Sequence, residues 1–178
     1  ATYDGAKMKV FVDGSVRVEP APADAPPQAD GSPAKARVSM VISVEGRRVA
    51  LDPELRGGIA EDMRIFYDWF SPEGSIDLTG LFAFGPGPQD KFRSYIELEP
   101  LPGSSAKFVF FPYPVHDLTG KVVLDGADTY MRNLGGRNGD VKFSVPFGWF
   151  RDGQYHMAFR VVDCPIDQRL IDASPKAL

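Results

Sequence analysis

The sequence predicts an all-β domain: an antiparallel β-sandwich or jelly-roll barrel with at most one or two short helical turns and extended proline-rich arms. Short segments in which apolar and polar residues alternate recur along the chain, and glycine or proline turns separate them without the strand–helix–strand rhythm of a parallel sheet. The 178 residues include 18 glycines and 16 prolines, which favours turns over long helices. This length fits one domain over residues 1–178.

The clearest strand signals lie in the first third of the chain. Residues 37–45 alternate cleanly, so Val38, Met40, Ile42 and Val44 share one face of a half-buried strand that ends in a turn at Glu45-Gly46. Residues 9–12 and 15–19 also alternate. The Asp13-Gly14 dipeptide between them predicts a β-hairpin with a tight turn.

The remaining predicted elements are mostly short strands. A helical turn is expected over 52–56, because an aspartate and then a proline begin it. Weaker helical signals lie at 59–63 and 167–171, and residues 135–139 are expected at a loop tip. The further strands expected are 47–51, 64–70, 75–84, 91–99, 107–111, 120–125, 141–145 and 154–162.

Two segments are expected to form extended arms, at residues 20–36 and 163–178. The first holds five prolines within positions 20–33, a composition that excludes a helix or a central strand. Such a segment buries little by itself, so we expect Pro22, Pro26 and Pro27 to lie against a neighbouring subunit. A solvated loop is the alternative interpretation.

Charge, cysteine content and hydropathy exclude several classes of protein. A net charge of -4 and a pI near 5.2 argue against a nucleic-acid partner bound by bulk electrostatics. Cys164 is the single cysteine, so an intramolecular disulfide and a multi-thiolate metal site are excluded. The sequence has no apolar run of about 18 residues, so no membrane span is expected. No signal-peptide pattern opens the sequence. The localisation stays open: virion or extracellular for an assembly protein, and cytoplasmic otherwise.

No pattern predicts a catalytic residue or a cofactor. The two histidines do not form a triad, because His116 and its neighbour Asp117 would point to opposite faces of an extended chain. The sequence has no nucleophile-elbow, Walker or dinucleotide motif. Asp68 and Glu97 lie in aromatic-rich segments, so an enzyme with carboxylate or metal chemistry remains the least favoured class.

Three aspartates are weak candidates for a calcium site. Asp125 and Asp128 flank one oxygen-rich turn, and Asp140 follows Asn138-Gly139 in another. Tight turns prefer the same residue types for local hydrogen bonding, so no metal is assigned.

Aromatic residues give the most suggestive functional pattern. On a strand over 64–70, Tyr67 and Trp69 would share a face, and Trp149 and Phe150 form a second group. If exposed, these rings would anchor a protein interface or stack on a sugar, and the alternative is burial between two layers. We therefore expect a non-catalytic structural or assembly protein, whose partner is a second copy or another protein, of the virion capsid or decoration type by analogy of architecture. A carbohydrate- or ligand-binding module, with a glycan as partner, is the alternative.

Overall fold

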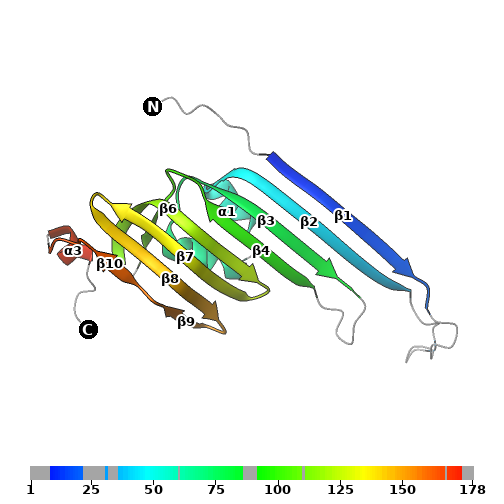
Figure 1. Cartoon of the computed structure of the whole chain (residues 1–178). Coiled ribbons are helices and arrows are strands. Elements are labelled where there is room, and N and C mark those ends of the chain that lie inside the picture. Colours follow the sequence, from blue (N-terminus) through cyan, green and yellow to red (C-terminus); the bar gives the residue numbers. More distant parts are fainter. Residues whose placement is uncertain are drawn as a thin grey trace.

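The computed structural model describes residues 9–21, 31, 36–59, 61–85, 92–109, 111–166 and 168–173. In this part of the chain, ten strands form one open antiparallel sheet in the order β1-β2-β3-β4-β6-β7-β8-β10, while β5 pairs with β6 and β9 with β8 (Figure 1). The prediction of an all-β, antiparallel fold is confirmed, and the sheet is open. The strands are β1 (Lys9–Glu19), β2 (Arg37–Ala50), β3 (Ser75–Phe84), β4 (Arg93–Pro100), β5 (Ser105–Phe108), β6 (Phe111–Asp125), β7 (Asp128–Asn138), β8 (Val141–Arg151), β9 (Gln154–Met157) and β10 (Arg160–Val162).

Short turns make the C-terminal half an up-and-down meander. Asp125 pairs with Asp128, so a two-residue turn joins β6 to β7, and Asn138 pairs with Val141 across the turn from β7 to β8. The turn from β8 to β9 is Asp152-Gly153, and both residues have positive φ, 50° and 73°. Positive φ at both central positions is what a type I′ hairpin requires.

The hairpin predicted at Asp13-Gly14 is wrong. β1 passes straight through this dipeptide and pairs with β2 from Lys9↔Arg47 to Glu19↔Arg37. The long β2 provides backbone hydrogen-bonding partners along all of β1, so the chain does not turn at this dipeptide. Glycine suits position 14 because a Cβ there would lie only 3.1 Å from the carbonyl oxygen of Val41. Here the Asp-Gly pair is used as extended strand, and residues 20–36 connect β1 to β2 instead.

Two other predicted turns also lie within strands. The turn expected at Glu45-Gly46 is a bulge in β2, where the register with β3 shifts between Gly46 and Val49 and Arg48 has a φ of 54°. Of residues 135–139, expected at a loop tip, 135–138 lie inside β7 and Gly139 lies in the turn to β8. A Cβ on Gly136 would come within 2.4 Å of Val115, so close packing against β6 explains this glycine.

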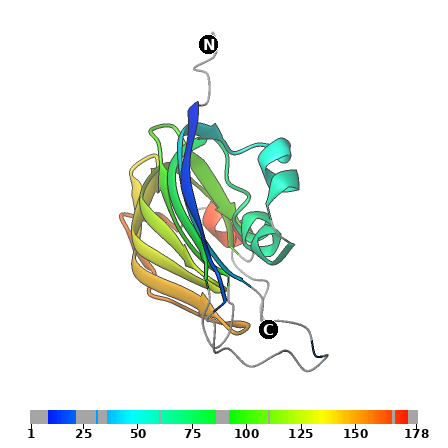
Figure 2. The same ribbon diagram turned by 90° about the vertical axis from the view of Figure 1, so that its right-hand side faces the viewer.

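Helices supply the second layer of the fold. They are α1 (Pro53–Gly58), α2 (Glu61–Phe70) and α3 (Gln168–Ala173), and Figure 2 shows α1 and α2, in cyan and teal, together on one side of the sheet. The predicted start of α1 is confirmed, because the Asp52 side chain accepts a hydrogen bond from the Leu55 N–H at 2.9 Å and Pro53 follows it. α3 lies at the helical signal in the tail, so the predicted second arm is not extended throughout.

The strand predicted over 64–70 is wrong, because these residues form most of α2. Their aromatic content favours a strand, but Ile65 and Trp69 are four residues apart and so lie on one side of a helix. Packing decides the outcome. Trp69 makes edge-to-face contacts with Phe150 at 5.8 Å and Tyr155 at 6.4 Å, and Phe70 stacks on Phe108 at 5.0 Å between ring centroids.

Two groups of the described core involve β6. Val123 and Met131, exposed by only 1% and 2%, lie in the middle of the sheet, while Tyr113, Val141 and Phe143 form a cluster where β6, β8 and β10 meet. β6 bends between these groups, since Gly120 has a φ of 97° and the register with β7 shifts between His116 and Thr119 and again between Thr119 and Lys121. The bend thus lets one long strand contribute to both groups of the core.

We predict that Gly120→Ala lowers the free energy of unfolding by at least about 2 kcal/mol, because alanine disfavours this φ and its Cβ would lie 2.3 Å from the Asn133 carbonyl oxygen. Urea denaturation measures the change. Gly57→Ala is the control, because Gly57 lies in α1 with open space around its Cβ position. That variant should be neutral or stabilised by about 0.5–1 kcal/mol. Equal stability of the Gly120 variant and the parent would contradict the account of the bend.

Candidate interaction surface

The register of β1–β4 places apolar side chains on one face of the sheet. Val16 lies opposite Met40, which lies opposite Phe84, and Val12 lies opposite Val44. The same face continues through Ile96 of β4 to Leu124 of β6. Side chains that lie opposite each other in adjacent strands point the same way, so these pairs build one apolar face across the sheet.

Helix α2 packs near β5, β8 and β9, where Trp69 contacts Phe150 and Tyr155 and Phe70 stacks on Phe108. Over β1–β3, Val12, Val16 and Val18 are exposed by 66%, 64% and 61%. Phe92 belongs to the same face, since its ring stacks on Phe82 at 6.0 Å. We call the exposed group the open apolar face; its members are Val12, Val16, Val18, Val38, Phe84 and Phe92.

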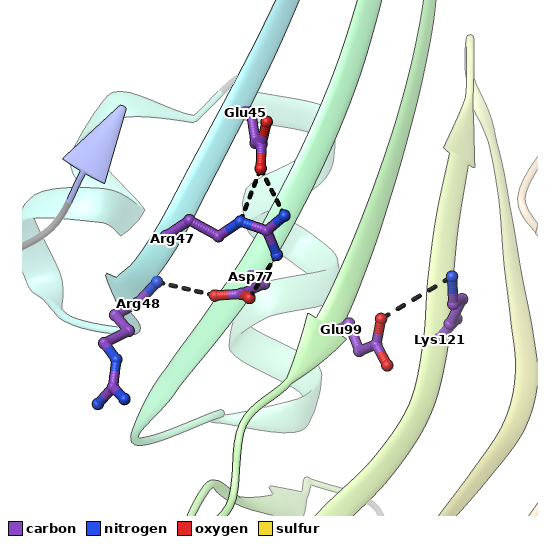
Figure 3. Close-up of polar contacts among 6 residues, drawn as sticks. All are labelled: Glu45, Arg47, Arg48, Asp77, Glu99 and Lys121. Carbon is purple, nitrogen blue, oxygen red and sulfur yellow. Dashed lines mark hydrogen bonds and ion pairs between the residues drawn. The ribbon is translucent and has the colours of Figure 1, made fainter. Parts of the chain in front are cut away.

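The opposite face of β2 and β3 is polar and well organised (Figure 3). Arg47 donates hydrogen bonds to Glu45 at 2.7 Å and to Asp77 at 2.8 Å, and the backbone N–H of Arg48 donates to Asp77 at 2.9 Å. The Arg48 backbone bond, together with the Arg47 guanidinium, holds the pKa of the Asp77 carboxyl below its usual value. The bulge that gives Arg48 its positive φ therefore also supplies a hydrogen-bond donor to this network.

Further ion pairs continue the polar face. Lys121 lies 3.2 Å from Glu97 and 3.8 Å from Glu99 (Figure 3 shows the second pair). Glu97 also accepts a hydrogen bond from the Tyr95 hydroxyl at 2.7 Å, and these two hydrogen bonds hold the pKa of the Glu97 carboxyl below its usual value, with the Tyr95 bond as the larger cause. The two faces of the sheet thus differ: ion pairs are found on this face, which also exposes Val41 and Leu81, whereas the other face is apolar.

The structure separates the predicted calcium candidates. Asp125 and Asp128 lie at one end of β7 and Asp140 lies beyond the other. Arg151 donates to the Asp128 carboxylate at 2.7 Å, and Tyr130 donates at 3.1 Å. The Arg151 bond lowers the Asp128 pKa. Within the described residues, no three histidine, cysteine, aspartate or glutamate side chains gather into a metal-binding group.

The predicted aromatic anchors do not form one platform. Trp69 and Phe150 pack against each other between α2 and the sheet, and the Tyr67 hydroxyl donates to the Asp52 carbonyl at 3.3 Å. Burial raises the pKa of that hydroxyl. Trp149 follows the alternation of β8 to the polar face, where it stacks on His156 at 6.1 Å.

A small apolar pocket adjoins the α2 contact, with a volume of about 20 Å³, which is room for a water-sized molecule. Its lining includes no charged side chain; it consists of Trp69, Phe70, Phe108, Met131, Phe150, Tyr155 and Met157. This pocket is a packing gap between α2 and the β8–β9 hairpin, and the polar groups of its lining side chains are the Trp69 indole N–H and the Tyr155 hydroxyl.

The residues considered for catalysis lie apart and have other partners. Asp68 accepts two hydrogen bonds from Arg56, at 2.6 and 2.7 Å, which join α2 to α1. Asp117 accepts a hydrogen bond from Arg137 at 2.7 Å, on a different part of the fold from Glu97.

Pro22, Pro26 and Pro27, predicted to contact a neighbouring subunit, lie outside the described residues.

Sequence reasoning missed the open apolar face because it divided β1 into two strands. A usable signal was present: positions 10, 12, 14, 16 and 18 are Val, Val, Gly, Val and Val, so the alternation continues through Gly14 without a change of phase. A hairpin at Asp13-Gly14 would place the valines before and after the turn on different faces, whereas a continuous strand places them on one face.

Comparisons with known proteins give no family for this chain: no family model, no curated protein and no solved structure matches it. Among the described residues, none of the helices is long and apolar enough to cross a membrane.

We predict that Asp77→Asn lowers the free energy of unfolding at neutral pH. It should also make that free energy less sensitive to a fall in pH. Because the folded-state pKa of Asp77 is lowered, its stabilisation is present above the unfolded pKa of about 3.9 and is lost as the pH falls through the folded pKa. Urea midpoints measured from pH 7 down to about pH 3 should therefore converge for parent and variant at the acid end. Asp140→Asn, in an exposed turn, is the matched control. Parallel curves for Asp77→Asn and the parent would contradict the role of this network.

Proposed function

We propose that this chain is a non-catalytic structural or assembly protein that packs against a neighbouring copy of itself through the open apolar face. The observation that carries the proposal is the exposure of Val12, Val16 and Val18 on an edge strand whose face is covered by α2 elsewhere in the sheet. Monomeric proteins rarely expose a continuous apolar patch larger than a few hundred Å², and larger patches mark interaction sites.

Energetics favour a protein surface as the occupant. Burying a valine or phenylalanine side chain fully stabilises a complex by about 1.5–3 kcal/mol, so the six members of the open apolar face provide a strong driving force. Association costs translational freedom and side-chain entropy, which offsets part of this gain. A second copy carries the same open apolar face, so the apolar faces of two copies can cover each other.

The face that carries the ion pairs indicates on which side of the sheet a neighbouring copy is not expected to bind. Ion pairs such as Arg47–Asp77 and Lys121–Glu97 keep that side of the sheet hydrated, so neighbours are expected on the apolar side and at the β1 edge. A capsid or decoration subunit would use such an asymmetric element, and this remains an analogy of architecture. No described contact favours the carbohydrate-binding alternative, because Tyr67 and Trp69 lie at α2 while Trp149 lies on the polar face.

The experiment compares two double variants by size exclusion with light scattering. Val38→Lys with Phe84→Lys places two charges on the open apolar face, whereas Val41→Lys with Leu81→Lys places them at similarly exposed positions on the opposite face of the same strands. We expect the parent and the second variant to show multiples of 19.5 kDa and the first variant to shift towards 19.5 kDa. A parent mass of 19.5 kDa at all concentrations, or equal effects of both variants, would contradict the proposal.

A deletion tests the proline-rich segment separately. Glu19 and Arg37 pair directly, so removing residues 22–33 leaves a five-residue connection that still allows the β1–β2 hairpin to form. If Pro22, Pro26 and Pro27 contact a neighbour, the oligomer should weaken while the circular dichroism spectrum stays unchanged. An unchanged oligomer would assign the contact to the open apolar face alone.

A further inference from the structure

We propose that β1 pairs antiparallel with β1 of a second copy, about a two-fold axis through Ser15, so that two sheets join into one. This inference rests on the proposed self-assembly and adds an edge contact to it, because the joined open apolar faces lie on one side of the continuous sheet, where a further copy can cover them. It draws on three observations: an edge that is open in the described structure, a self-complementary pattern of side chains, and continuity of the open apolar face.

β1 is the long edge of the sheet. It stands at the end of the strand order, and within the described residues it pairs only with β2 (Figure 1). Its eleven residues contrast with the opposite edge, where β9 and β10 have four and three residues. Every residue from Phe11 to Pro20 is exposed. A long edge strand presents backbone N–H and C=O groups that favour the addition of another strand, and in β1 the Gly14 N–H bonds to the Asp13 carboxylate at 2.9 Å.

The side chains of β1 match a copy of themselves in the reversed direction. An axis through Ser15 places residue numbers that sum to 30 opposite each other, so Asp13 faces the partner's Arg17 and Arg17 faces the partner's Asp13. On the apolar side, Val12 faces the partner's Val18, also twice. Opposite charges and apolar residues in directly opposed positions both stabilise antiparallel pairs.

Neighbouring registers are less well matched. An axis through Val16 would place Asp13 opposite the partner's Glu19, which are like charges. An axis through Gly14 would leave Asp13 opposite the partner's Ser15 and Arg17 opposite the partner's Phe11, so both central charge pairs would be lost. The charges beside Ser15 therefore favour the Ser15 register.

The two-fold axis also joins the apolar faces. An axis perpendicular to the sheet keeps directly opposed residues on the same side, because side chains of opposed residues point the same way. The open apolar faces of both copies then form one continuous surface with β1 and the partner's β1 at its centre. Val12, Val16 and Val18, exposed in the single chain, gain apolar neighbours across the junction.

Disulfide trapping tests the pairing. In a Cys164→Ser background, Ser15→Cys should give a covalent dimer under mild oxidation, because two directly opposed residues across the axis have the Cα separation that a disulfide needs. Ser43→Cys is the matched control: it is exposed and lies on the neighbouring strand β2, opposite Asp13, away from the edge. We expect the cross-link with Ser15→Cys alone.

Charge exchange tests the register. Asp13→Arg places like charges opposite each other at two symmetric positions, so the dimer dissociation constant should rise roughly tenfold or more. The double variant Asp13→Arg with Arg17→Asp restores opposite charges and should return it near the parent value. Asp140→Arg, exposed in the β7–β8 turn, should leave it unchanged.

Failures of this inference and of the proposed function are distinguishable. An assembled parent with an uncross-linked Ser15→Cys variant, or with no rescue by the charge exchange, would overturn the β1 pairing and leave assembly through the open apolar face. A parent that remains monomeric throughout, with no cross-link, would overturn both. Circular dichroism of each variant confirms that the sheet is retained before either result is interpreted.

Discussion

An open antiparallel sheet with one apolar face must hide that face from water, and the arrangement of this molecule follows from how far its own helices can do so. α1 and α2 lie between β2 and β3 in the chain, but α2 reaches across to β8, where Trp69 packs on Phe150 and Tyr155. That contact covers the face at its β8–β9 end. At the other end the alternating valines of β1 stay exposed, and an intermolecular contact there would bury apolar surface.

Bulges and positive-φ residues shape the sheet. Arg48 in β2, Asp117 and Gly120 in β6 and Asn133 in β7 all have positive φ and accompany the register shifts recorded in β2 and β6. Bulges increase local twist and bend strands, so a long strand such as β6 can change direction along its length. At Arg48 the bulge also turns a backbone N–H towards Asp77, so shape and electrostatics are linked at one residue.

The chemical difference between the two faces is what connects the fold to the proposed role. Charged pairs on one face keep it in contact with water, whereas the members of the open apolar face have no such pairs. Natural edge strands are usually short, charged or covered, and β9 and β10 fit that pattern. β1 carries charges at Asp13, Arg17 and Glu19 but is much longer, with eleven residues, and this length is understandable if the edge is a contact surface.

Local sequence determined the all-β class, the strand over 37–45, the start of α1 and the turn residues of the meander, because alternation, capping and positive φ depend on neighbours within a few positions. The open apolar face could not be predicted from local sequence. Asp13-Gly14 resembles a hairpin until β2 supplies a continuous partner, and 64–70 resembles a strand until Trp69 finds Phe150 and Tyr155. Whether Val16 is core or surface depends on how far α2 extends over the sheet. Tertiary structure decided these points because each involves residues distant in the chain, whose packing energy exceeds the small local preferences.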